Sequence, residues 1–396
     1  MKSAVVPFMS PLLGDCFVPD LGIAAEREAV HARITSVAPP TLTLTPQLSG
    51  WIDEFIAFLI PVAHQCDPVD VDYLYDQQDR PTQRRILDAA QFLLPNSIAQ
   101  CFIKKETYGK LAPPRIITQI NASDKEAYSK YMYTFAEVLK NHNWYAFGKT
   151  PLMVAQRVAE IAMSAKVCTA NSDFKRFDGH GSNIMRDLER RTLLRAFRHE
   201  HHNQLCELHR SQYGLRAFTT NGIEYETLYA RASGSPETSS FNGVTNAFVS
   251  YIEARIRHME PQDAWNGLGI YGGDDGLTAD VGIDSYTRAA QMIGQEIEVE
   301  LTPVGSLGVM FLSRVYGPHV WYGDATSCCD LPRQLTKLHT TVCLTRDVTP
   351  IDKLVEKSRA YWLTDEHTPI LGPFVSKVIA LYGSMPSPTA ATALDR

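Results

Sequence analysis

The sequence predicts an α+β fold in which helices cover one face of a small antiparallel sheet. From residue 166 to 302 the pattern runs strand, helix, helix, hairpin, helix, strand, an order typical of such a layered arrangement. One hairpin carries an Asn-Gly turn signal at Asn221-Gly222, and the other has a glycine-rich tip. The 44% hydrophobic and 21% charged residues of the 396-residue chain are typical of a folded protein with one large or two to three ordinary domains.

The first 165 residues are mostly helical in pattern and contain one basic hairpin. A helical patch is followed by a Pro/Thr-rich connector at residues 38–46 and by helical periodicity from 47 to 100. Residues 102–120, FIKKETYGKLAPPRIITQI, predict two β-like arms around a Gly/Pro turn, and a long helical stretch follows at 123–165. The positive charge of this hairpin comes from Lys104, Lys105, Lys110 and Arg115.

Alternating elements continue to the C-terminus. The pattern predicts a strand at 166–174, a charged helix from about 182 to 210, a hairpin at 214–234 and a helix from 237 to about 258. It then predicts a hairpin at 270–278, a helix at 285–295, a strand at 296–302 and a hairpin at 309–323. The last segment is shorter and helical, and a frayed tail is expected at 386–396.

Composition excludes some classes of protein. The net charge of −6 argues against a uniformly basic nucleic-acid coat, so binding to a polyanion would depend on local basic patches. The eight cysteines form no C-x-x-C pair, which favours reduced thiols in an intracellular setting. The longest apolar candidate, residues 51–63, is too short and too charged to span a bilayer, so no transmembrane segment is expected.

Two adjacent carboxylates, Asp274 and Asp275, lie within the stretch IYGGDDGLT. A solvated turn is the ordinary explanation, because Gly and Asp are common turn residues. A divalent cation is the alternative, and it requires further carboxylates. Asp173 ends the strand at 166–174 and Asp178 follows five residues later. By itself this D-x4-D spacing is a weak signal, but a strand end and a hairpin tip can together supply the oxygen ligands of a two-cation site.

A polar stripe accompanies the helix predicted from residue 237. Thr238, Asn242 and Asn246 are spaced by four residues and share one helix face, after the flexible turn Ser233-Gly234. A solvated helix face is common. However, Asn and Thr are mediocre helix formers, and a row of donors and acceptors that contacts a ribose 2′-hydroxyl would explain them.

These pieces, in this order, resemble the palm motifs of viral RNA-dependent RNA polymerases. SDFKRFDG resembles motif A, SGSPETSSFN motif B and GGDDG motif C, while KKETYGKLAPPR resembles the basic motif F and FLSR the motif E hairpin. The match covers roughly residues 102 to 322. The residues of motifs A and B are most similar to those in the polymerases of positive-strand viruses of the nodavirus and tombusvirus type. The resemblance implies a right-hand polymerase with fingers, palm and thumb that joins NTPs on an RNA template by a two-metal mechanism.

The resemblance also implies roles for individual residues. Asp173, Asp274 and Asp275 would be catalytic metal ligands for Mg²⁺, with Mn²⁺ able to substitute. The incoming ribose would be bound by Asp178 and Asn242, helped by Ser233 and Thr238. Gly234 would belong to the same substrate-binding group. The triphosphate channel would be lined by Lys104, Lys105 and Arg115. The sequence departs from the family in motif D, because no Lys occurs between Lys175 and Lys337 and the nearest cation is Arg288, a poor acid.

The implied domains are an N-terminal extension with fingers at 1–165, which includes the basic hairpin 102–120, and palm at 166–182. Helix and hairpin elements of fingers and palm follow at 183–230, palm with motifs B to E at 231–322, and a small thumb and tail at 323–396. The implied partners are template and nascent RNA, NTPs, and other replicase domains or membrane-bound replication proteins. The implied location is the host cytoplasm, at membrane-associated replication sites reached through those domains or partners.

Three alternatives to this function remain open on sequence grounds. A reverse transcriptase should avoid the Asp178 and Asn242 pair, because it must exclude a 2′-hydroxyl. A palm-type nucleotide cyclase would not need the basic hairpin or the helix after Ser233-Gly234. A catalytically inactive palm would serve as an RNA-binding subunit.

Two further groups of residues on charged helices have simpler explanations. His202, Cys206 and His209 share one helix face and can ligate zinc, but no fourth ligand is visible and a polar helix face is the commoner explanation. Salt bridges to Asp187 and Glu189 are the ordinary explanation for Arg186, Arg190 and Arg191.

Overall fold

The computed structural model describes residues 2–383, except for 4, 5, 8, 10, 15, 79, 343 and 345–347. The predicted tail at 386–396 and Cys343 lie outside this part. The seven described cysteines are present as thiols, without a disulfide between any two of them. Among the described helices, none is both long enough and apolar enough to cross a membrane.

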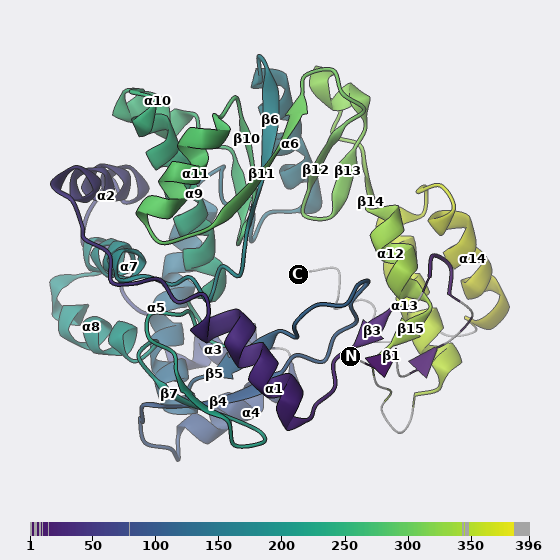
Figure 1. Cartoon of the computed structure of the whole chain (residues 1–396), viewed down its shortest axis with the longest axis horizontal. Coiled ribbons are helices and arrows are strands. Elements are labelled where there is room, and N and C mark those ends of the chain that lie inside the picture. Colours follow the sequence, from purple (N-terminus) through teal and green to yellow (C-terminus); the bar gives the residue numbers. More distant parts are fainter. Residues whose placement is uncertain are drawn as a thin grey trace.

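A four-stranded antiparallel sheet, which we call the central sheet, lies in the upper part of the view in Figure 1. Its strand order is β11 (Ile297–Pro303), β6 (Cys168–Phe174), β10 (Asp275–Ala279) and β9 (Ile270–Gly272). Helices α9 (Thr238–Ile256) and α11 (Ile283–Met292) pack on one face, as the sequence predicts. The prediction that helices cover one face only is wrong, because α6 (Pro151–Ser164) and strand β12 (Val309–Phe311) pack on the other. The two faces therefore belong to two separate hydrophobic clusters.

Helix α9 is enclosed on all sides. Every residue from Ser240 to Ala254 is buried, including Asn242 and Asn246. A helix buried all round is expected in the core of a large protein, and it excludes the explanation of the polar stripe as a solvated face. The two asparagines are interior polar groups, and each requires a hydrogen-bonding partner.

A second sheet unites the two hairpins predicted at 102–120 and 214–234. Its strand order is β5 (Ile116–Gln119), β4 (Ile98–Ile103), β7 (Arg216–Thr219) and β8 (Glu224–Glu226). Both hairpins are confirmed, and the parallel pairing of β4 with β7 that joins them was not predicted. Helix α1 (Ile23–Val30) and the π-helical η1 (His31–Thr35) adjoin this sheet and contribute to its core.

Two helices predicted as continuous are each divided. The stretch 123–165 forms α5 (Ala122–Lys140) and α6, because Thr150 caps a new helix that starts with Pro151. The stretch 182–210 forms α7 (Asn183–Ala196), the 3₁₀ helix η2 (His199–His201) and α8 (His202–Arg210). Here Phe197 has an extended backbone and forms a bridge with Cys66. The other helices before the central sheet are α2 (Pro46–Leu59), α3 (Val71–Gln77) and α4 (Pro81–Ala90), and α10 (Pro261–Asn266) follows α9.

The C-terminal part begins with a three-stranded sheet of β12, β13 (Arg314–Tyr316) and β14 (Ser327–Cys329). The hairpin predicted at 309–323 is confirmed for β12 and β13 only. Pro318 has no N–H to donate to a strand ladder, and the chain forms the 3₁₀ helix η3 (Pro318–Tyr322) instead. The helices that follow are α12 (Leu331–Leu338), α13 (Pro350–Asp365) and α14 (Leu371–Tyr382).

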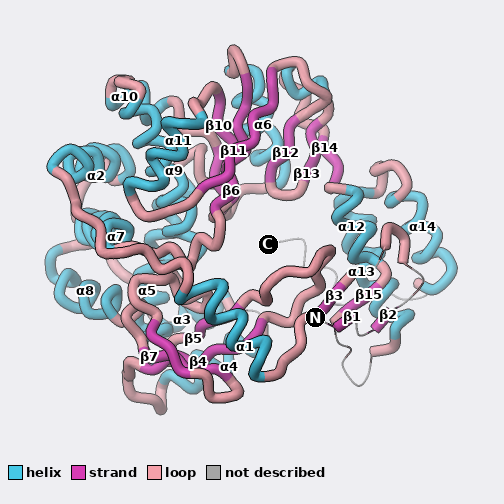
Figure 2. Tube along the Cα trace, in the orientation of Figure 1, coloured by secondary structure: helices cyan, strands magenta, loops and turns pink. Residues whose placement is uncertain are grey.

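The N-terminal segment links distant parts of the chain. Strand β2 (Val6–Pro7) pairs with β15 (Thr340–Thr341), and β1 (Lys2–Ser3) pairs with β3 (Phe17–Val18). Phe17 also exchanges backbone hydrogen bonds with Tyr108, on the loop between β4 and β5. This loop and the C-terminal helices thereby approach each other across the molecule, which Figure 2 shows as a ring of elements.

Candidate active site

A cavity of about 900 Å³ lies between the central sheet, the second sheet and the start of α9. Seven of the residues singled out in the sequence line it: Arg115, Asp173, Asp178, Ser233, Thr238, Asn242 and Asp274. Four others, Lys104, Lys105, Gly234 and Asp275, do not. These seven residues come from four separate sequence segments.

The pairing of β6 with β10 brings the carboxylates together. Gly276 lies opposite Ser172, so Asp173 lies beside the tip of the β9–β10 hairpin. At that tip Gly273 has φ +73°, a conformation that favours glycine. A Cβ atom on Gly276 would lie 2.3 Å from Ser172 Oγ, so the close approach of these two strands also requires glycine.

Burial and the nearby charge of Asp274 raise the pKa values of Asp173 and Asp275. Burial raises the pKa of Asp173, and the charges of Asp274 and Glu298 raise it further. Burial raises the pKa of Asp275 to about 6, with additional contributions from Asp274 and Asp173. Among the described residues no cation forms a salt bridge with any of the three. Like charges that form no salt bridge to a described residue favour the binding of a cation, and oxygen-only donors suit a hard ion such as Mg²⁺.

The spacing of these donors is wider than that of a closed metal cage. The three carboxylates are not among the groups of described residues whose ligand atoms all lie within 4.8 Å of one another. An open arrangement is expected where substrate phosphates and water supply further ligands. The residues present therefore fit an Mg²⁺ or Mn²⁺ ion that is coordinated partly by protein carboxylates and partly by a phosphate substrate.

Asn242 has an unused acceptor beside Asp178. Its Nδ2 donates to Asp178 Oδ1 at 3.2 Å, while its Oδ1 is buried and has no partner among the described residues. Burial raises the pKa of Asp178, and Arg231 opposes that shift. A buried carbonyl oxygen without a donor costs free energy, so this atom is placed to accept a hydrogen bond from a bound molecule.

Ser233, Gly234 and Thr238 shape the turn before α9. Ser233 Oγ accepts from Thr118 N at 3.2 Å, and Thr238 Oγ1 donates to Ala232 O and Ser235 O, both at 3.0 Å. A Cβ atom on Gly234 would lie 2.7 Å from Thr118 O. Ser233 Oγ in turn donates to Ile116 O at 3.4 Å, so these contacts hold the turn against β5 and both hydroxyls donate to backbone oxygen atoms.

The basic hairpin contributes one cation to the cavity wall. Arg115 binds Glu106 with two hydrogen bonds, of 2.5 and 2.8 Å, and Lys104 Nζ lies 3.1 Å from the same carboxylate. Sequence reasoning missed four further lining cations, Arg33, Lys175, Arg176 and Arg231, and the imidazole of His180. Lys175 and Arg176 lie inside the D-x4-D spacing itself, which was the available signal.

A buried charged cluster adjoins the cavity through Arg231. We define it as Arg186, Glu189, Arg231 and Glu237, which are all at most 4% exposed. Arg231 contacts Glu189 at 2.5 Å and Glu237 at 2.9 Å, and Arg186 contacts the same two carboxylates at 2.8 and 2.5 Å. Burial alone would raise the pKa of Glu189, but the two guanidinium groups hold that pKa well below its ordinary value.

The buried charged cluster is connected to the cavity by the backbone of Arg231, whose N–H donates to Asp178 O at 2.8 Å. The salt-bridge explanation of the arginines on α7 is confirmed, since Arg190 and Arg191 both pair with Asp187. For Arg186 the partner is Glu189, and the depth of burial was not predicted.

The three possible zinc ligands on α8 do not converge. His209 Nε2 lies 3.0 Å from Glu189, inside the protein, while His202 Nε2 lies 3.0 Å from Phe197 O. Cys206 belongs to none of the potential metal-binding groups among the described residues. His202, Cys206 and His209 therefore do not form one zinc site, in agreement with the preference for an ordinary helix face, because helical spacing places side chains on a face without directing them at a common point.

Comparison with known proteins gives several matches along most of the chain. The sequence is 33% identical over 334 residues to the RNA-directed RNA polymerase of Greasy grouper nervous necrosis virus, covering 83% of this chain and 33% of that protein. It is 31% identical over 370 residues to that of Atlantic halibut nervous necrosis virus, covering 91% and 37%. For Flock house virus the identity is 27% over 403 residues, covering 96% and 39%. The chain thus spans about a third of the length of the curated relatives it matches.

The fold also has a counterpart among solved structures. The RNA-dependent RNA polymerase of a human picobirnavirus superposes with a TM-score of 0.71 at 11% identity, covering 95% of this chain and 80% of that chain. At this identity the likeness concerns the fold alone. No family model matches the sequence.

Proposed function

Because this chain is homologous over most of its length to the RNA-directed RNA polymerases of nodaviruses, we propose that it carries the catalytic core of such an enzyme and joins ribonucleotides on an RNA template. The observation that carries this proposal is the cavity in which Asp173 and Asp274 face Asp178 and Asn242. Asp173 and Asp274 are suited to bind cations and, through them, phosphate. Asp178 and Asn242 are suited to bind a ribose hydroxyl.

The proposed domains follow the same comparison. Residues 1–165 form an N-terminal extension and fingers, and 183–230 add a helix and hairpin to fingers and palm. Residues 166–182 and 231–322 form the palm, whose centre is the β11-β6-β10-β9 sheet. Residues from 323 onward form a small thumb made of α12, α13 and α14.

The proposed reaction is attack of an RNA 3′-hydroxyl on the α-phosphate of an NTP, with release of pyrophosphate. Asp173 and Asp274 would hold two Mg²⁺ or Mn²⁺ ions, with Asp275 in support. When bound, such ions activate the hydroxyl and neutralise charge that develops on the phosphate. Arg115 and the lysine and arginines on the cavity wall attract the triphosphate, and the buried charged cluster keeps the backbone of Asp178 in place.

The proposed partners are template RNA, nascent RNA and NTPs. Because RNA would be bound mainly through its phosphates and 2′-hydroxyls, affinity should fall steeply with salt. Association with membrane-bound replication proteins in the host cytoplasm remains a prediction from the resemblance.

Primer extension tests this proposal. The purified chain is incubated with a primed homopolymeric RNA template and the matching NTP, in Mg²⁺ and then in Mn²⁺. We expect extension that depends on the template and on the cation. A strong preference for dNTPs would contradict the proposal in favour of a reverse transcriptase. RNA binding without extension in either cation would favour an inactive palm.

The Asn242→Ala variant should lose selectivity for ribose. The unused Oδ1 of Asn242 would accept from the 2′-hydroxyl, and a hydrogen bond of about 1–1.5 kcal/mol corresponds to a discrimination of about five- to tenfold. We expect the ratio of kcat/KM for NTP over dNTP to fall by this factor, mainly through slower NTP use. The exposed Asn203→Ala variant is the matched control, and an unchanged ratio in Asn242→Ala would remove the assigned role.

The affinity for Mg²⁺ should weaken below pH 6. The pKa values of Asp275, at about 6, and of Asp173 are raised, so these groups hold protons that a cation must displace. Below pH 6 we expect affinity to fall about tenfold per pH unit for each proton displaced. Without metal, the free energy of unfolding should change in the opposite direction with pH. Because these carboxyl groups bind protons more tightly in the folded state, the stability of the metal-free protein decreases as pH rises from about 4 to above 6.

Calorimetric Mg²⁺ titrations between pH 5 and 7.5, in two buffers of different ionisation enthalpy, measure both the affinity and the protons released. The Asp275→Asn variant should release fewer protons. Equal affinities at pH 5.5 and 7.5 would contradict the assignment.

A further inference from the structure

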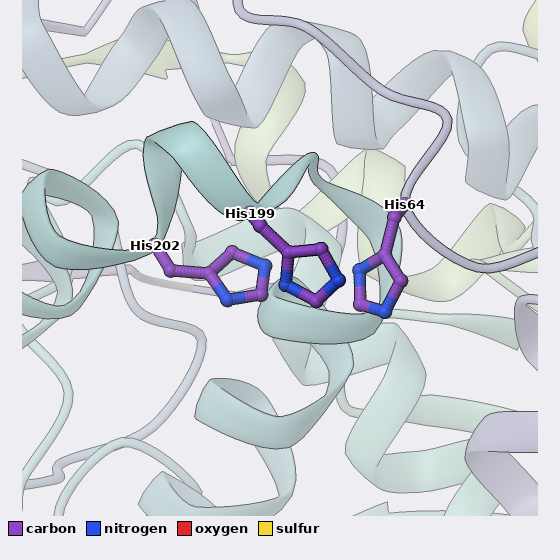
Figure 3. Close-up of side chains that lie close together, drawn as sticks. All are labelled: His64, His199 and His202. Atoms are coloured by element: carbon purple, nitrogen blue, oxygen red, sulfur yellow. The ribbon is translucent and has the colours of Figure 1, made fainter.

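Three histidines from distant segments meet outside the cavity (Figure 3). His64 lies in the loop after α2, His199 lies in η2, and His202 begins α8. The ring centroids of His64 and His199 are 4.0 Å apart, those of His199 and His202 4.8 Å, and those of His64 and His202 5.5 Å. One ligand nitrogen of each ring lies within 4.8 Å of one on each of the others. We call this group the histidine cluster.

Backbone hydrogen bonds hold the loop of His64 against the end of α7. His64 N donates to Arg195 O at 2.7 Å and Cys66 N to Ala196 O at 3.0 Å, while Arg198 N donates back to Cys66 O at 3.2 Å. His64 itself has φ +60°, an uncommon conformation for a residue other than glycine. The fold therefore maintains a strained backbone at the point where this ring joins the other two.

A single carbonyl oxygen orients two of the rings. Phe197 O lies 3.1 Å from His64 Nδ1 and 3.0 Å from His202 Nε2. Metal-binding imidazoles are commonly positioned by a neighbouring backbone carbonyl. His199 makes no side-chain hydrogen bond to the described residues, and it is exposed. In Figure 3 its ring lies between the other two.

These dimensions are close to those of a zinc site. At a Zn–N distance of about 2.0–2.1 Å, two imidazoles on a tetrahedral ion have nitrogens about 3.3 Å apart and ring centroids about 5 Å apart. The three centroid separations lie on both sides of that value. The His64 and His199 rings, 4.0 Å apart with planes at 35°, are closer than that value, so binding one ion requires the exposed His199 ring to rotate.

We infer that the histidine cluster binds one divalent transition-metal ion of the zinc class. Imidazole suits Zn²⁺, Cu²⁺ and Ni²⁺, whereas Mg²⁺ and Mn²⁺ prefer oxygen ligands, so this site and the carboxylates of the cavity select different ions. None of the three histidines lines the cavity. The ion clamps the loop after α2 to the junction of α7 and α8.

A neighbouring group offers the alternative position for an ion. Asp67, Glu200 and His201 also have ligand atoms within 4.8 Å of one another, and His201 Nε2 lies 3.0 Å from Asp67. This group contains two carboxylates and one imidazole, so it is a weaker match to a soft ion. A variant of His201 separates the two positions.

The test is a zinc titration of the untagged chain in millimolar MgCl₂, which saturates oxygen-ligand sites. We compare wild type with His64→Ala, His199→Ala and His201→Ala, and with His367→Ala as the matched control, because His367 is fully accessible and far along the chain. We expect one Zn²⁺ per wild-type chain. The dissociation constant should rise at least about tenfold in the His64 and His199 variants and stay unchanged in the other two.

A thermal measurement gives an independent readout. Saturating Zn²⁺ should raise the unfolding midpoint of wild type and of His367→Ala by a few degrees, and should leave that of His199→Ala unchanged. Because His199 is exposed, its replacement should not prevent folding. Absence of saturable binding, equal binding by His199→Ala and wild type, or loss of binding in His201→Ala alone would each overturn the inference. RNA synthesis is measured separately, and its presence or absence does not alter this outcome.

Discussion

We expect Asp274→Asn to reduce RNA synthesis about a thousandfold or more while the fold and RNA binding persist. Asp274 lies at the tip of the β9–β10 hairpin, beside Asp173 and on the cavity wall. The amide has nearly the same shape but no charge, and it cannot hold a hard cation as a carboxylate does. Metal ions supply several kcal/mol of transition-state stabilisation, and each 1.36 kcal/mol is tenfold in rate.

The measurement is single-turnover primer extension at saturating Mg²⁺, with circular dichroism and RNA binding measured on the same preparation. The matched control is Asp284→Asn, which makes the same change at an exposed position in the first turn of α11. Turnover within tenfold of wild type in Asp274→Asn would refute the assignment of Asp274 as a metal ligand. Loss of activity in both variants would indicate a general effect of charge.

Arg231→Met should produce the largest loss of stability. Arg231 is 3% exposed and contacts two carboxylates, Glu189 and Glu237, that are both 0% exposed. Methionine fills a similar volume but leaves the buried charged cluster with one uncompensated negative charge. Removing one partner from such a group costs about 3–5 kcal/mol, a large part of the roughly 5–15 kcal/mol that keeps a domain folded.

Urea unfolding followed by fluorescence measures this change. The control is Arg216→Met, since Arg216 pairs with Glu224 at the surface, and an exposed pair contributes about 1 kcal/mol or less. Adding Glu237→Gln to Arg231→Met should recover part of the lost stability, because it removes the excess charge. Equal midpoints for Arg231→Met and Arg216→Met would show that the cluster does not stabilise the fold.

Local sequence patterns predicted the chemistry at the tip of the hairpin. Adjacent glycines and aspartates predict a tight turn, and Gly273 does adopt a positive φ there. The Asn221-Gly222 signal likewise predicts the turn between β7 and β8, which the structure confirms. Such turns can be predicted from sequence because they require backbone conformations, such as a positive φ, that few residue types adopt.

Contacts between segments that are distant in the sequence could not be predicted from those local patterns. Nothing local indicates that Arg231 lies between Glu189 and Glu237, or that Arg33 of η1 lines the cavity. Helical spacing grouped His202 with His209, but His202 meets His64 and His199 instead. The reason is that the direction of a side chain at the end of a helix depends on the segment packed against that end. Here that segment is the loop after α2, which contains His64.

The sequence by itself therefore determined the order of strands and helices, the identity of the acidic residues, and the turns that expose them, because each of these depends on short-range steric and hydrogen-bonding preferences. Which strands pair, which helix is enclosed on every side, and which charges neutralise one another followed from tertiary packing. Burial of α9 converts Asn242 from a surface residue into a buried group with an unused acceptor. That change arises from the removal of water by segments far apart in the chain, which no local pattern encodes.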